Sequence, residues 1–152
     1  MTWDVQIRAA QPYDSKTCAV IYAAGRARAF SWVDESRFHL SDYHRDVQGE
    51  EVWVAEAGGR VVGFASIWTL DNFLHHLYVA AGYERKGVGS ALLEHVCKSL
   101  HGCVRLKCVV ANRTALDFYR KRGWVEGETG EAALGTYVVL RTPRMVAREA
   151  SA

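Results

Sequence analysis

The stretch Tyr83–Val96, with the sequence YERKGVGSALLEHV, decides the fold of this 152-residue chain. Gly87 and Gly89 follow two basic residues and lead directly into apolar residues that recur every three to four positions. That spacing predicts an amphipathic helix beginning at the glycine loop. The first N–H groups of a helix lack intrahelical partners and carry partial positive charge, so the loop predicts an anion-binding site. From this loop alone, a tight turn with solvated basic side chains is an equal alternative.

Spacing excludes two other kinds of phosphate-binding loop. A Walker loop requires Lys and then Ser or Thr after its last glycine, where this chain has Val88 and Gly89. A dinucleotide fingerprint requires a third glycine where Leu92 stands, and its loop follows the first strand of its unit. Neither a nucleoside triphosphate nor a dinucleotide is therefore expected as the ligand.

The segments around this loop alternate between strand and helix periodicity. A strand is expected at residues 3–9, a helix from Pro12, and one or two short helices within residues 30–48. Residues 51–57 and 61–68 read as a hairpin across a glycine turn, followed by a strand at 73–80. After the loop helix come a strand at 103–110, a helix capped by Asn112 that ends before Gly123, and strands at 124–128 and 135–141. The order predicts one α/β domain over residues 1–152 with a mixed sheet.

Composition narrows the function. Hydrophobic residues make up 49% and charged residues 24% of the chain, and its formal net charge of +2 gives no general attraction to nucleic acid or membranes. The first ten residues do not read as a signal peptide, and the longest uncharged apolar stretch, residues 61–70, is too short to span a bilayer. The four cysteines lack metal-ligand spacing, so reduced thiols, no metal and a cytoplasmic location are expected.

Two motifs then point to a family. LYVAAGYERKGVGSALL, residues 77–93, resembles the acetyl-CoA motif of the GNAT superfamily of N-acetyltransferases, and NRTALDFYRKRGW, residues 112–124, resembles its second motif. Glu84 departs from the pattern because it stands where the signature has Gln or Arg, so its side chain is expected to add nothing to cofactor binding. The backbone N–H groups, which carry most of the binding in this family, are unaffected.

The resemblance implies a GNAT-like fold, a mixed and mostly antiparallel sheet of about seven strands flanked by about four helices. It also implies direct transfer of an acetyl group from acetyl-CoA to a primary amine of a small molecule or peptide, in a ternary complex. The implied cofactor-binding residues are Leu77, Tyr78, Val79, Arg85, Lys86, Gly87, Val88, Gly89, Ser90, Asn112 and Phe118. A homodimer is suggested by resemblance alone.

Three tasks define the expected catalytic groups. Tyr119 matches the family's general acid, although full proton transfer from a phenol to a thiolate is uphill by about 2 kcal/mol. The attacking amine must lose a proton, and His75 or His76 is the candidate base, with Asp71 and Glu35 as less favoured alternatives. Because neighbouring strand residues point to opposite faces, only one of the two histidines is expected to face the substrate.

The acceptor is less well defined by the sequence. Trp32, Glu35 and Asp71 are the candidate substrate-binding residues, within an aromatic and acidic group that also includes Phe30, Asp34 and Glu131. A CoA-binding module without turnover is an alternative function, and a toxin that acetylates charged tRNA is a further one that the modest net charge disfavours.

Overall fold

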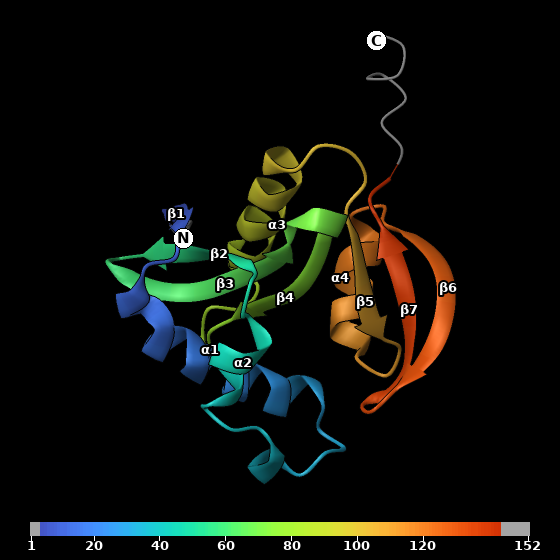
Figure 1. Ribbon diagram of the computed structural model, residues 1–152, viewed down its shortest axis with the longest axis horizontal. Helices are drawn as coiled ribbons and strands as arrows, with labels where there is room; N and C mark the ends of the chain where they lie inside the picture. Colours follow the sequence, from blue (N-terminus) through green and yellow to red (C-terminus); the bar gives the residue numbers. More distant parts are fainter. Residues whose placement is uncertain (1–3, 144–152) are drawn as a thin grey trace, which may run out of the picture. The chain divides into compact units, whose positions relative to one another are not determined.

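The computed structural model describes residues 4–143, so Trp3 of the first expected strand and the frayed end expected at residues 148–152 lie outside it. The described residues form two compact units, one ending at Gly102 and the other beginning at Cys103. Together they contain seven strands and four α-helices, which confirms the predicted α/β class (Figure 1). A single domain over residues 1–152 stays a prediction.

The first unit contains a sheet with the strand order β1-β2-β3-β4, in which each neighbouring pair is antiparallel. Short 3-10 helices occupy Pro12–Asp14, Glu35–Arg37 and Thr69–Asp71. The strands and α-helices of this unit are β1 Val5–Ala9, α1 Ser15–Ala29, α2 Asp42–Asp46, β2 Glu51–Ala57, β3 Arg60–Trp68, β4 Phe73–Val79 and α3 Val88–Ser99.

Helices cover both faces of this sheet, as adjacent residues of β3 show. The Phe64 ring lies 6.0 Å from the ring of Tyr22 on α1. A Cβ added to Gly63 would lie 3.1 Å from Val88 and 3.2 Å from Leu92, both on α3. Successive strand residues point to opposite faces, so α1 and α3 pack on opposite sides and Gly63 allows the close approach of α3.

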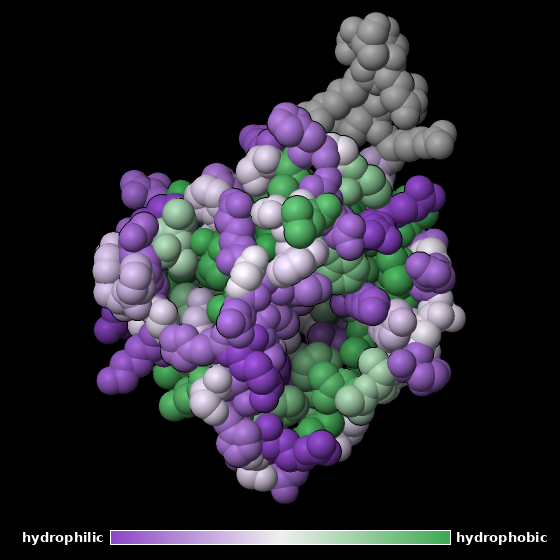
Figure 2. All heavy atoms as spheres, in the orientation of Figure 1, coloured by the Kyte–Doolittle hydropathy of each residue, from purple (hydrophilic) through white to green (hydrophobic). Residues whose placement is uncertain are grey.

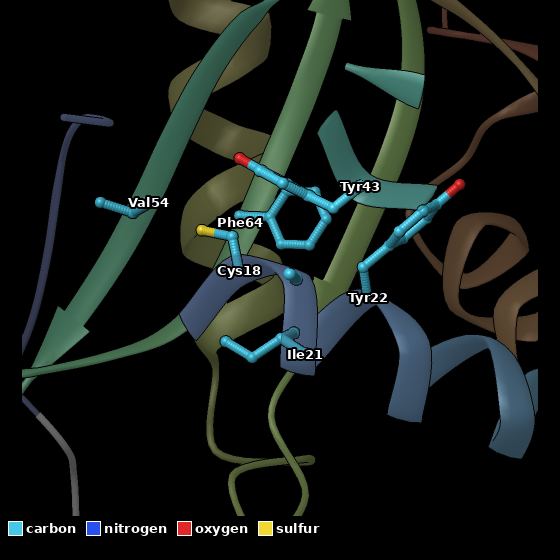
Figure 3. Close-up of a cluster of buried hydrophobic side chains, with 7 residues drawn as sticks. Cys18, Ile21, Tyr22, Tyr43, Val54 and Phe64 are labelled. Carbon is cyan, nitrogen blue, oxygen red and sulfur yellow. The ribbon is translucent and has the colours of Figure 1, made fainter. Parts of the chain in front are cut away.

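The core on the α1 face is built from side chains that are distant in sequence. Figure 3 shows α1 presenting one face toward the sheet, where it meets a tyrosine of α2. The buried members of this core are Cys18, Ala19, Ile21, Tyr22, Tyr43, Val54 and Phe64. Residues 18, 21, 22 and 25 of α1 are all buried.

The second unit contains β5, β7 and β6 in that order, paired antiparallel. Asn112 caps α4 as predicted, since its side-chain oxygen accepts from the Ala115 N–H at 3.3 Å, and Gly123 follows with a φ of 79°. The strand expected at 124–128 is longer than predicted. The elements are β5 Arg105–Val109, α4 Arg113–Lys121, β6 Val125–Ala132 and β7 Gly135–Arg141.

Two further expectations concern thiols and membranes. All four cysteines are free, and burial raises the pKa of Cys18 and Cys108 to about 11. Within residues 4–143, no helix has the length and apolar character that a membrane span requires. On the face shown in Figure 2, polar residues are interspersed with smaller groups of apolar ones.

Candidate functional site

The glycine loop before α3 has the backbone of an anion site. Gly82, Arg85 and Gly87 have φ values of 88°, 60° and 85°, and the one at Arg85 is unusual for a residue with a side chain. The N-cap residue Gly87 has no side chain that could accept from the first turn, and the Ala91 N–H donates to the Gly87 carbonyl at 3.0 Å. The N–H groups of the first turn therefore point out of the helix start, toward the space an anion would occupy.

Glu84 is engaged with the loop rather than with solvent alone. Its carboxylate accepts from the Gly82 N–H at 2.9 Å and lies 3.6 Å from the guanidinium of Arg28 on α1. Arg28 also donates to the Val79 carbonyl at 2.9 Å. The acid at the signature position is thus paired with a cation from another helix, which reduces its repulsion of an incoming anion.

The end of β4 presents backbone groups away from β3. Ala80 N–H donates to the Val62 carbonyl at 2.8 Å, and the register pairs Phe64 with Tyr78. In an antiparallel ladder, hydrogen-bonded pairs alternate with pairs whose N–H and C=O groups face outward. The groups of Leu77 and Val79 therefore point away from β3, as a strand that binds an extended substrate arm would require.

A β-bulge brings the two histidines of β4 together. Ser66 pairs with His76 but Ile67 pairs with Leu74, so His75 is an extra residue in its strand. A bulge re-aims a side chain, and the ring nitrogens of His75 and His76 both lie within 4.8 Å of a Glu50 carboxylate oxygen and of each other. The bulge interrupts the regular alternation that was expected of the two side chains, and which histidine faces the substrate stays a prediction.

Glu50 is the residue that the sequence reading missed. It ends a tight turn in which its N–H donates to the Val47 carbonyl at 2.9 Å. Only 4% of its side chain is exposed, and its carboxylate accepts from the hydroxyl of Ser66 and from Nδ1 of His75. No spacing in the chain links Glu50 to residue 75, so the one available signal was an acid immediately before an apolar strand.

His75 and His76 differ in environment. The His75 side chain is 40% exposed, whereas His76 is half-buried and its ring lies 5.0 Å from that of Tyr22. Burial lowers the pKa of His76, which favours its neutral form. One histidine of the cluster is thus open to solvent and the other is held inside.

The predicted residues of the second unit lie along α4. Tyr119 is 7% exposed and packs against Trp124, with ring centroids 5.4 Å apart. Phe118 is half-buried under the guanidinium of Arg122, which lies 3.7 Å from its ring. Asn112 uses its amide oxygen as the helix cap. The position of these residues relative to the glycine loop stays a prediction.

The predicted substrate-binding residues are exposed and belong to connecting segments. Trp32 is 49% exposed, and its ring meets that of Phe30 at 5.7 Å. Glu35 lies in the short helix before Phe38, and Asp71 ends the short helix before β4. Glu131 in the second unit accepts from Thr136 at 2.8 Å. Their gathering into one pocket stays a prediction.

Comparisons with known sequences agree with the two motifs. The profile of the acetyltransferase (GNAT) family matches residues 18–124. The uncharacterized N-acetyltransferase YafP of Escherichia coli K12 is 30% identical over an alignment of 133 residues that covers 80% of this chain and 81% of that protein. The peptidyl-lysine N-acetyltransferase YiaC of the same organism is 35% identical over 72 residues, 47% of this chain and 48% of that protein.

Solved structures show the same fold. A GCN5-related N-acetyltransferase from Rhodopseudomonas palustris superposes with a TM-score of 0.79 and 18% identity, covering 95% of this chain and 99% of that one. The PaiA N-acetyltransferase of Thermoplasma acidophilum, solved in complex with coenzyme A, gives a TM-score of 0.72 at 18% identity. The match covers 93% of this chain and 99% of that one.

Proposed function

The chain belongs to the acetyltransferase (GNAT) family and is an acyltransferase, and on that premise we propose that it transfers an acetyl group from acetyl-CoA directly to a primary amine. The observation that carries the proposal is the family match over residues 18–124, because it spans both the glycine loop and the second motif. The coenzyme A complex of the Thermoplasma acidophilum structure, which has this fold, supports acetyl-CoA as the donor.

The donor's pyrophosphate would be held at the start of α3. A loop whose N-cap residue is a glycine leaves room for a phosphate group beside the first turn. Arg85 and Lys86 add positive charge, and the outward-facing groups of Leu77 and Val79 would pair with the pantetheine arm. The residues proposed to bind acetyl-CoA are Leu77, Tyr78, Val79, Arg85, Lys86, Gly87, Val88, Gly89, Ser90, Asn112 and Phe118.

In the transfer, the amine nitrogen forms a bond to the thioester carbonyl carbon and the carbon–sulfur bond breaks. A backbone N–H of β4, at Leu77 or Val79, would stabilise the negative charge that develops on the carbonyl oxygen. Tyr119 would give a hydrogen bond or its proton to the departing thiolate. The amine proton goes to a base, which completes the proton balance.

His75 is the better placed of the two candidate bases. A carboxylate can only accept, so Nδ1 of His75 donates to Glu50 and Nε2 keeps its lone pair. Glu50 thereby fixes the tautomer and the orientation of a ring that is partly open to solvent. His76 is the poorer candidate because its ring is half-buried and burial lowers its pKa, which makes it a weaker base.

The acceptor is proposed to be a small-molecule amine or a peptide lysine. The name of the partial relative YiaC, a peptidyl-lysine N-acetyltransferase, favours the peptide. Trp32, Glu35 and Asp71 remain the proposed substrate contacts, since an aromatic ring and carboxylates suit a cationic amine. A homodimer is proposed by resemblance to the family.

The test is thiol release from acetyl-CoA with a panel of polyamines, amino-acid amides and lysine peptides, with the product identified by mass spectrometry. We expect one class of amine to be acetylated, and Tyr119→Phe or His75→Ala to slow the reaction about a hundredfold or more. His101→Ala, an exposed histidine outside the site, serves as the matched control. Unchanged turnover in both site variants would remove Tyr119 and His75 from these roles.

A further inference from the structure

The cluster of Glu50, His75 and His76 has a second chemical capacity besides accepting a proton. Within residues 4–143, the three side chains form a group whose potential ligand atoms all lie within 4.8 Å of one another. They come from two segments 25 positions apart, the turn before β2 and the bulge of β4. We propose that Glu50, His75 and His76 form a binding site for a transition-metal dication of the Zn²⁺ class.

The donor set selects the class of metal. Two imidazoles and one carboxylate are ligands suited to Zn²⁺, Cu²⁺ or Ni²⁺, whereas Mg²⁺ and Ca²⁺ prefer oxygen ligands throughout. Zinc sites with three protein ligands of the His₂Glu type keep a fourth position open for water or substrate. The cysteine spacing, on which the expectation of no metal rested, does not bear on this cluster.

Groups around the ligands hold them as the outer partners of a metal site do. The second carboxylate oxygen of Glu50 accepts from Ser66, whose side chain is fully buried. The His76 ring packs edge to face against the ring of Tyr22, with centroids 5.0 Å apart. Such outer contacts orient carboxylate and imidazole ligands toward a metal. His75, 40% exposed, leaves a path for the ion from solvent.

The charges of the cluster also suit a cation. Only 4% of the Glu50 side chain is exposed, and a carboxylate that is withdrawn from water requires a hydrogen-bond donor or a cation as its partner. In the metal-free protein, the proton on Nδ1 of His75 serves that purpose. A bound Zn²⁺ would take the place of this proton and would bond to Nδ1, to Glu50 and to His76. The proton displaced from Nδ1 is taken up at Nε2, so that His75 stays a neutral imidazole.

The test is calorimetric titration of the full chain with Zn²⁺ after treatment with a chelator, and Co²⁺ binding followed by its visible absorption. We expect one metal per chain, with intense ligand-field bands for Co²⁺. Ser66→Ala should weaken Zn²⁺ binding about 10- to 100-fold, and Glu50→Gln or His75→Ala at least as much. Melting curves check that the variants fold. His75→Ala should disturb folding least, because the His75 side chain is 40% exposed.

Two control variants separate this site from adventitious binding. Cys103→Ser removes an exposed thiol, and His101→Ala removes an exposed imidazole outside the cluster. Both should bind Zn²⁺ as the parent does, and Mg²⁺ should give no binding heat. Zinc binding that survives in Glu50→Gln and His75→Ala, or that is lost in Cys103→Ser, would overturn the proposal.

If the proposed function also holds, Zn²⁺ should inhibit acetyl transfer in proportion to its occupancy, because it takes His75 out of proton transfer. This consequence alone rests on the proposed function. Binding without inhibition would keep the metal site and remove His75 as the base.

Discussion

At the residue scale, the carboxylate of Asp14 accepts three hydrogen bonds. Arg8 donates to both of its oxygens, at 2.8 and 3.0 Å, and the Gln11 N–H donates at 2.7 Å. These bonds lower the pKa of Asp14 below its ordinary value, and the bond from Arg8 has the largest effect. Burial alone would raise this pKa, but the hydrogen bonds outweigh it. They tie β1 to the start of α1.

We therefore expect Asp14→Asn to lower the free energy of unfolding by about 1–3 kcal/mol at neutral pH. The folded protein binds fewer protons at Asp14 than the unfolded chain does, so this stabilisation is complete above the ordinary pKa of about 3.9. It is lost as the pH falls through the lowered pKa. Urea unfolding at several pH values measures the difference, with the exposed Asp117→Asn as control. A difference that stays constant into strong acid would contradict this role.

Residues whose role depends on local backbone were predictable from the sequence. Asn112 caps α4 and Gly123 follows it with positive φ, because both effects involve neighbours within a few positions. Glu50 could not be found in this way, because its partners lie 16 and 25 positions away, on β3 and β4. Those contacts depend on strand register rather than on spacing along the chain.

At the element scale, α1 packs on β4 through a glycine. A Cβ added at Gly25 would lie 2.5 Å from Cδ1 of Tyr78, closer than real contacts allow. In an exposed helix, Gly to Ala stabilises by about 1 kcal/mol, but here the Tyr78 ring must move. We expect Gly25→Ala to destabilise by about 1–3 kcal/mol and to weaken acetyl-CoA binding, since Tyr78 lies on the proposed cofactor strand.

Chemical denaturation and calorimetric titration with acetyl-CoA test this prediction. Ala24→Gly, at the exposed neighbouring position of α1, is the matched control and should cost only the helix propensity of about 1 kcal/mol. A stability gain in Gly25→Ala would show that the ring yields easily and that the packing of α1 on β4 is loose.

The elements themselves were predicted well, because hydrophobic periodicity sets their type. The course of β4 was predicted, but its bulge was not, since nothing in FLHHLYV marks an extra residue at His75. A bulge is fixed by pairing with β3, and one unpaired residue changes which side chains share a face. For this reason the sequence predicted that one of the two histidines is the base, whereas in the structure both histidines lie beside Glu50.

At the scale of the whole molecule, the proposed chemistry needs both units. The glycine loop, β4 and the Glu50 cluster belong to the first unit, and Tyr119 belongs to the second. The family match runs through both, from residue 18 to residue 124. The binding of acetyl-CoA by the intact chain is therefore the central claim.

Thermal unfolding of the full chain with and without acetyl-CoA tests this claim most directly. Acetyl-CoA at about a hundred times its dissociation constant should stabilise the folded state by about 2.7 kcal/mol and raise the melting temperature by several degrees. Free CoA should give a similar or smaller shift, because it shares the pyrophosphate. No shift with either ligand, at concentrations far above micromolar, would contradict the proposed acetyl-CoA site at the start of α3.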